Sequence, residues 1–139
     1  MPTRLGKKTA VDIIRAEAAV LDTDRQAVIG TLPSGEIVSW NGTAERIYGW
    51  SFAEVEGRSI LDVTPSALSR EQAAIILQSL HEGRSWSGTF EVQAKSGAVF
   101  RMEVRDIPLM NRHGELIGLI GVSTRAPEPD AEGRELPDR

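Results

Sequence analysis

None of the 139 residues is cysteine. This absence excludes disulfides, thiolate nucleophiles, iron–sulfur clusters and cysteine-ligated zinc in this chain. Histidine is scarce as well, and neither His81 nor His113 has a second metal-binding residue at ligand spacing. The sequence therefore predicts no metal site.

Basic clusters and long apolar runs are also missing. The formal net charge is -4, whereas a protein that binds duplex nucleic acid needs a basic face for the phosphates. No stretch has the length and apolar character of a membrane span or a secretory signal. We therefore expect no nucleic-acid partner, no membrane association and a cytoplasmic location.

What is present fits one ordinary globular domain, because 40% of the residues are hydrophobic over a length typical of a single core. An amphipathic helix is predicted from Thr9 to about Asp22. Its apolar stripe consists of Val11, Ile14, Ala18 and Leu21. The small residues in this stripe permit close packing, so the helix can cover its own sheet or pair with a second copy.

Five strands are predicted after this helix, with further helices between the second and the third strand. Two short ones surround a turn at Pro33, Ser34, Gly35 and Glu36, and three more follow after Gly83. The segments AVIGTL and LIGLIGVST are apolar on both faces, so we expect the first and last strands to be central neighbours. Alternation slips near Asp106 and Pro108, which predicts a bulge or strand end there.

The short helices expected between the second and third strands have recognisable capping residues in the sequence. Asn41 can cap the first, and Ser51 with Glu54 has the spacing of a capping box. A longer helix is expected to begin at Ser69, with Gln72 completing a second capping box. Leu68 is expected to pack onto Ala73 at its start, and Gly83 to end it.

This order of elements, with the segments GEIVSWNGTAERIYGWSFAEVEGRSI and GELIGLIGVST, resembles the PAS family of sensory domains over roughly Gln26 to Arg125. The resemblance implies an α+β fold. A five-stranded antiparallel sheet carries the short helices and one longer helix on one face, and the amphipathic helix is added at the N-terminus. We expect three segments: residues 1–24 as that helix, 25–126 as the PAS domain, and 127–139 as a polar tail or linker.

The branches of the family that hold a cofactor are a poor match. Gly57-Arg58-Ser59-Ile60 stands where the light-sensing branch has Gly-Arg-Asn-Cys, so Ile60 replaces the cysteine that bonds to flavin. Val92, Met102 and Ser123 replace polar residues that hold the flavin ring in that branch. Glu71 stands at the position of the haem-ligand histidine. We therefore expect neither flavin nor haem.

The family's interior is expected to be apolar in this chain. Its candidate lining residues are Ile47, Ile60, Ile76, Leu80, Phe90, Val92, Met102, Val104, Leu119 and Ser123. Two interpretations stay open. The side chains meet and fill the interior, which we favour, or an apolar ligand such as a fatty acid occupies it.

Glu91, Glu103 and Asp106 are the candidates for acid–base catalysis. Strand alternation places Glu91 and Glu103 on the outward face, and no Ser–His–Asp pattern is present, so we expect no enzyme activity.

The resemblance implies instead a regulatory sensor or interaction module of a bacterial-type signal-transduction protein. It would act through dimerisation or partner binding, with a histidine kinase or another effector attached or as a partner. In the family such an N-terminal helix often forms the dimer contact, so we expect a homodimer.

Overall fold

The computed structural model describes residues 6–127. The elements in chain order are α1 (Lys7–Leu21), β1 (Ala27–Thr31), β2 (Ile37–Trp40), α2 (Gly42–Tyr48), α3 (Phe52–Val55), the 3-10 helix η1 (Ile60–Asp62), α4 (Arg70–His81), β3 (Trp86–Gln93), β4 (Val99–Met110) and β5 (Leu116–Arg125). The predicted α+β class and the N-terminal helix are confirmed.

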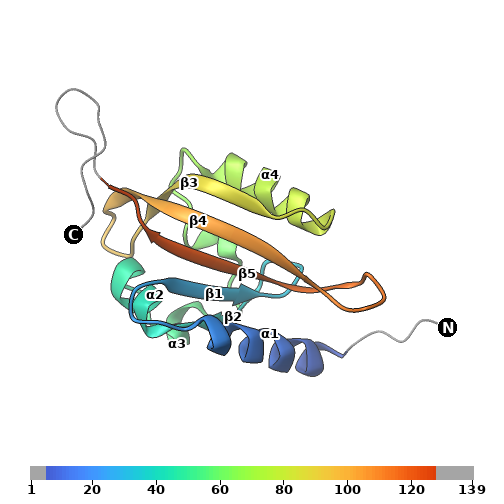
Figure 1. The fold of residues 1–139 in the computed structure, drawn as a ribbon. Helices are drawn as coiled ribbons and strands as arrows, with labels where there is room; N and C mark the ends of the chain where they lie inside the picture. Colours follow the sequence, from blue (N-terminus) through green and yellow to red (C-terminus); the bar gives the residue numbers. More distant parts are fainter. Residues whose placement is uncertain (1–5, 128–139) are drawn as a thin grey trace.

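The sheet is antiparallel throughout, in the order β2-β1-β5-β4-β3 (Figure 1). Strand β5 lies at its centre and pairs with β1 from Ala27–Ser123 to Thr31–Leu119. All five residues of β1 are buried. The prediction that the first and last strands are central neighbours is therefore confirmed.

Helices cover both faces of this sheet. On one face, α2, α3, η1 and α4 enclose the larger core, which includes Trp40, Tyr48, Phe90 and Met102. On the other face, α1 packs on β1, β2 and β5 over a second apolar cluster (Figure 1). Strands β1 and β5 therefore separate two cores and contribute side chains to each.

Helix α1 covers the sheet of its own chain. Of its predicted stripe, Ile14 and Ala18 are buried against the sheet, Val11 is half-buried, and Leu21 is 38% exposed. Two glycines let the helix approach: a Cβ on Gly30 would lie 2.5 Å from Ile14 Cγ2, and one on Gly118 2.4 Å from Ile14 Cδ1. Ile14 and Ala18 are thus already used inside the chain, and a homodimer stays a prediction.

The corner after β2 is organised by Asn41. Its side-chain oxygen accepts hydrogen bonds from the backbone N–H of Ala44 at the start of α2 and of Val28 in β1. Its amide donates to Asp22 Oδ1 and to the Gln26 carbonyl. One side chain therefore caps a helix and ties it to the sheet. Next along the chain, Ser51 and Glu54 form a capping box at α3.

The prediction of a capping box at Ser69 is wrong. The Ser69 hydroxyl makes no cap hydrogen bond to α4. It donates instead to the Glu91 carbonyl on edge strand β3 at 2.6 Å, and it contacts Ser66. Leu68 is 88% exposed and packs on nothing at the start of α4. A long-range bond to the sheet has replaced the local cap.

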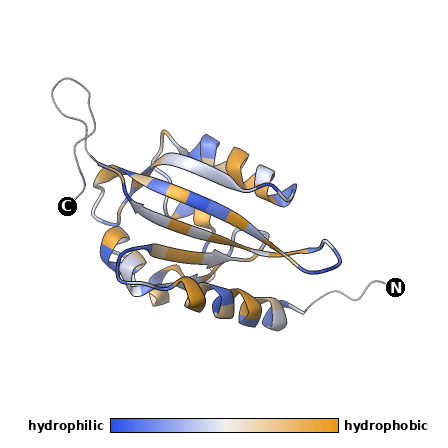
Figure 2. Cartoon of the chain, in the orientation of Figure 1, coloured by the Kyte–Doolittle hydropathy of each residue, from blue (hydrophilic) through white to orange (hydrophobic). Residues whose placement is uncertain are grey.

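The strand end that was one alternative near Asp106 and Pro108 is absent, whereas the other alternative, a bulge, lies just beyond Pro108. Strand β4 continues through Asp106 and Pro108, and the register shifts only after Leu109, where Ile117 of β5 is left unpaired. Figure 2 shows β4 as alternating hydrophobic and hydrophilic bands, as expected for a strand with one face in water. Asp106 therefore keeps the inward phase of Met102 and Val104.

Within residues 6–127 no helix is long and apolar enough to cross a membrane. The predicted tail, 127–139, lies outside the described residues except for Pro127, and the predicted segment boundaries stay predictions. Arg125 lies over the Phe100 ring, 4.1 Å from its centroid, and the Ala126 N–H donates to the Arg101 carbonyl. These contacts fasten the end of β5 to β4.

Candidate functional site

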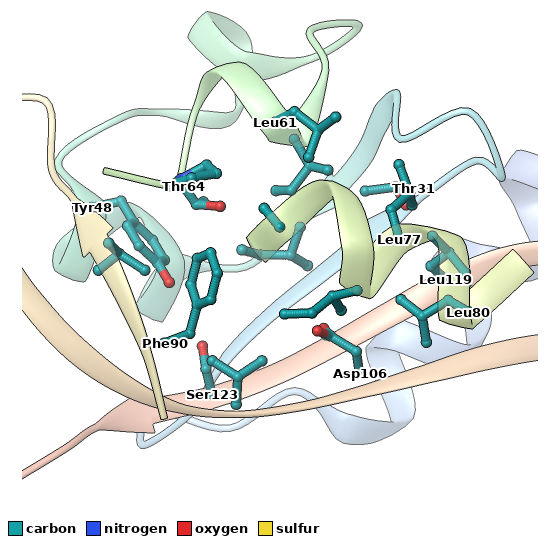
Figure 3. A pocket seen from close by; sticks show the side chains of 18 residues that line it. Thr31, Tyr48, Leu61, Thr64, Leu77, Leu80, Phe90, Asp106, Leu119 and Ser123 are labelled. Atoms are coloured by element: carbon teal, nitrogen blue, oxygen red, sulfur yellow. The ribbon is translucent and has the colours of Figure 1, made fainter. Parts of the chain in front are cut away.

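A cavity of about 110 Å³ lies between the sheet and the helices α4 and η1. Figure 3 shows side chains from both layers pointing into it. Eight predicted pocket residues line this cavity: Ile60, Ile76, Leu80, Phe90, Val92, Val104, Leu119 and Ser123. Whether they hold a ligand stays a prediction.

Two predicted pocket residues lie elsewhere. Met102 is fully buried in the core beside the cavity, and Ile47 packs half-buried against the same core. Neither reaches the cavity wall. Periodicity placed both side chains on the inward face, but it could not say which inward residues border an open space.

The apolar part of the wall follows from the pattern of α4. Ala73, Ile76, Leu77 and Leu80 recur at i, i+3, i+4 and i+7, so they share the face that looks at the sheet. Because α4 presents only aliphatic groups here, any polar contact to a ligand has to come from the sheet, α2, η1 or the segment after η1.

Apart from Ser123, the polar groups on the wall were not predicted from the sequence. Thr31 at the end of β1 is 4% exposed, and its Oγ1 has no hydrogen-bond partner. Buried hydroxyls nearly always have a partner, and an unpaired one costs about 1–3 kcal/mol. Thr31 shares the phase of Ala27 and Ile29, which was the available signal that it points inward. Thr64, after η1, adds a second hydroxyl to the wall.

Asp106 brings a carboxyl group to the same space. Residues 6–127 offer its side chain neither a hydrogen bond nor a salt bridge, and desolvation by burial raises its pKa to about 7. Opposite it on β5 stands Gly121, where a Cβ would lie 2.8 Å from Asp106 Oδ1. The missing side chain of Gly121 thus makes room for the carboxyl group.

Tyr48 closes the end of the cavity near α2. Its ring packs at centroid distances of 5.5 Å from Trp40 and 6.5 Å from Phe100. Burial raises the pKa of Tyr48 to about 12, while the neighbouring Ser123 acts in the opposite direction. The phenol is therefore neutral and able to donate or accept a hydrogen bond.

Among residues 6–127, no lysine, arginine or histidine lines the wall. The other carboxylates that were weighed for catalysis lie away from it. Glu91 accepts a hydrogen bond from the Ser66 hydroxyl at 2.5 Å, and Glu103 is exposed on the outer face. No group of three or more histidine, aspartate or glutamate residues among 6–127 could hold a metal ion. The arrangement suits binding of a small molecule by one carboxyl group, hydroxyls and apolar surface.

Comparisons with known proteins agree with this architecture. The PAS domain of a protein from Colwellia psychrerythraea superposes with a TM-score of 0.69 at 21% identity, over 82% of this chain and 97% of that one. The PAS-B domain of Cycle from Drosophila melanogaster, with bound ethylene glycol, gives 0.64 at 10% identity, over 71% and 98%. A variant of that domain with bound glycerol gives the same values. At sequence identities this low, the superpositions show only that the fold is shared.

No curated protein matches the chain in sequence. The PAS fold family matches residues 18–125, well over half of the chain, and this range includes every strand and the helices on the cavity side. The chain therefore belongs to the PAS family of sensory and signalling domains.

Proposed function

We propose that this domain is a sensor that binds a small molecule in the cavity between α4 and the sheet. The observation that carries the proposal is the unpaired Oγ1 of Thr31 on the cavity wall. In an interior that is completely filled by its own side chains, a buried hydroxyl is expected to have a hydrogen-bond partner. A ligand that hydrogen-bonds to Thr31 removes that cost.

The volume of the cavity limits the size of the ligand. Drug-sized ligands occupy pockets of roughly 300–1,000 Å³, and an engineered apolar cavity of about 150 Å³ accepts benzene. A cavity of about 110 Å³ thus fits a molecule of about half a dozen non-hydrogen atoms. This favours a compact ligand over a long-chain fatty acid, and it supports the expectation that neither haem nor flavin binds. The diols and triols reported in the Cycle domain are of this size class.

The effect of a ligand bound in the cavity can be transmitted to α1 through β1 and β5, the two strands that contribute to both cores. Thr31 and Leu119 border the cavity, while their neighbours Gly30 and Ile120 lie against Ile14 of α1. A ligand that shifts β1 or β5 therefore shifts the surface of the sheet on which α1 packs. We include in the proposal that α1 passes this change to a second copy or to an effector such as a histidine kinase of a bacterial-type pathway.

Isobutanol is a suitable probe of the cavity, because it has five non-hydrogen atoms and one hydroxyl group. Titration into ¹⁵N-labelled protein is expected to give saturable amide shifts near Thr31, Leu119 and Ser123. Ala73→Leu, which adds carbon atoms on the cavity wall, is expected to abolish them. Ala74→Leu, the same change on the exposed side of α4, is expected to leave them in place.

The absence of saturable shifts in the wild-type protein would contradict the proposal and favour a filled core. Equal binding by both leucine variants would show that isobutanol binds outside the cavity.

A further inference from the structure

We infer that the cavity selects a small protonated amine, whose ammonium group pairs with the Asp106 carboxylate while its apolar body lies against α4. This inference rests on the proposed function, because it names the chemical class of the ligand. The ligand would supply the positive charge that residues 6–127 do not place beside Asp106.

The position of Asp106 is the first step. It lies in the middle of β4, and Figure 3 shows its side chain pointing into the cavity between Leu80 and Ser123. Gly121 on the paired strand leaves the space that the carboxyl group occupies. The sheet therefore presents this group to the cavity, where a strand interior would normally present an apolar side chain.

The surrounding charges are the second step. Tyr48 is the other titratable group on the wall, and it is neutral. Charged groups on the adjoining elements are engaged or point away. His81 of α4 contacts the Pro33 carbonyl, Arg84 pairs with Glu82, and Arg105 is exposed on the opposite face. Within residues 6–127 no cation reaches the carboxyl group.

The hydrogen-bonding capacity of the wall is the third step. An ammonium group offers three donors and no acceptor. The carboxylate of Asp106 and the unpaired Oγ1 of Thr31 are both acceptors that face the cavity. Aliphatic side chains from α4, such as Ile76 and Leu80, supply the contact for a short alkyl body. Charge, acceptors and apolar surface thus match one class of molecule.

Three probes of similar shape and different charge test the inference: isobutylamine, isobutanol and isobutyrate, each titrated at pH 8 and followed by amide shifts. We expect isobutylamine to bind about tenfold tighter than isobutanol or better, and isobutyrate to bind most weakly. Asp106→Asn should reduce the affinity for isobutylamine to within about threefold of that for isobutanol. Glu103→Gln removes one negative charge from the outer face of the same strand and should leave the preference unchanged.

The pH dependence gives a readout that needs no variant. An aliphatic amine stays protonated from pH 5.5 to 8.5, whereas the carboxyl group with a pKa of about 7 changes from about 3% to about 97% ionised. The affinity for isobutylamine should therefore fall about tenfold as the pH decreases across this range, towards the affinity for isobutanol.

Equal or tighter binding of isobutanol or isobutyrate by the wild-type protein would overturn the inference and leave the proposed cavity site standing. Retention of the full preference for isobutylamine by Asp106→Asn would also overturn it. If none of the three probes gave a saturable shift, both the inference and the proposed function would fail.

Discussion

Asp106 and Thr31 show how single residues set the properties of this interior. Both lie on strands in the inward phase. The Oγ1 of Thr31 is buried without a partner, and the half-buried Asp106 forms no salt bridge within residues 6–127. The carboxyl group of Asp106 is desolvated, so the folded state favours its protonated form. Stability and the proposed ligand preference therefore depend on the same residue.

The stability of the ligand-free protein should depend on pH through this residue. The pKa of Asp106 is raised from 3.8 to about 7, so between these values the folded state binds more protons than the unfolded state. The stabilisation is complete below the unfolded pKa and is lost as the pH rises through the folded pKa. From pH 5 to 8 the wild-type free energy of unfolding should fall by about 2.5 kcal/mol relative to Asp106→Asn.

Urea unfolding of both proteins at several pH values measures this difference. Glu103→Gln, which lacks an exposed carboxylate, should follow the wild-type profile. Parallel profiles for wild type and Asp106→Asn would show that the carboxyl group is not desolvated in the folded state.

At the scale of elements, Ile14 is the most deeply inserted side chain of α1. Ile14 is fully buried and lies above Gly30 and Gly118, which leave the space for it. The helix has no side-chain cap at its N-terminus, and isolated helices of its length are marginal in water. Its position on the sheet therefore depends on packing.

Ile14→Ala should destabilise the protein by about 3 kcal/mol, because a fully buried isoleucine is lost and a cavity is left between α1 and the sheet. Ile75→Ala is the matched control, since Ile75 lies on α4 with 63% of its surface exposed. It should change stability by less than about 0.5 kcal/mol. Thermal or urea unfolding distinguishes the two, and equal effects would contradict the packing described for α1.

These elements also show what the sequence could and could not predict. Helical periodicity placed Ile76 and Leu80 on the inward face, and strand alternation did the same for Phe90 and Val92. Asp106 was misinterpreted because a polar residue in an apolar phase looks like a slip in register. Ser69 has the local signature of a cap, but a distant carbonyl on β3 competes for its hydroxyl.

The cavity itself could not be predicted from pattern. Whether inward side chains meet or leave a space depends on small details of packing between α4 and the sheet, such as the missing Cβ at Gly121. The pattern predicts which residues share a face, and only the folded structure shows which of them border an open volume.

At the scale of the whole molecule, the cavity and α1 lie back to back across β1 and β5. Alternate residues of these strands face the two cores, so we propose that a displacement on one side is transmitted to the other. A ligand acts as a signal only if it binds two arrangements of the protein with different affinity. In this account the two arrangements differ in how firmly α1 is seated on the sheet.

Hydrogen exchange tests this central claim most directly. Exchange would be measured by mass spectrometry with and without saturating isobutylamine at pH 8, in wild type and in Ala73→Leu. The account predicts changed protection in α4 and also in α1, residues 7–21, and no change in either for Ala73→Leu. Unchanged exchange of α1 in a wild-type protein whose α4 becomes protected would contradict transmission through the sheet.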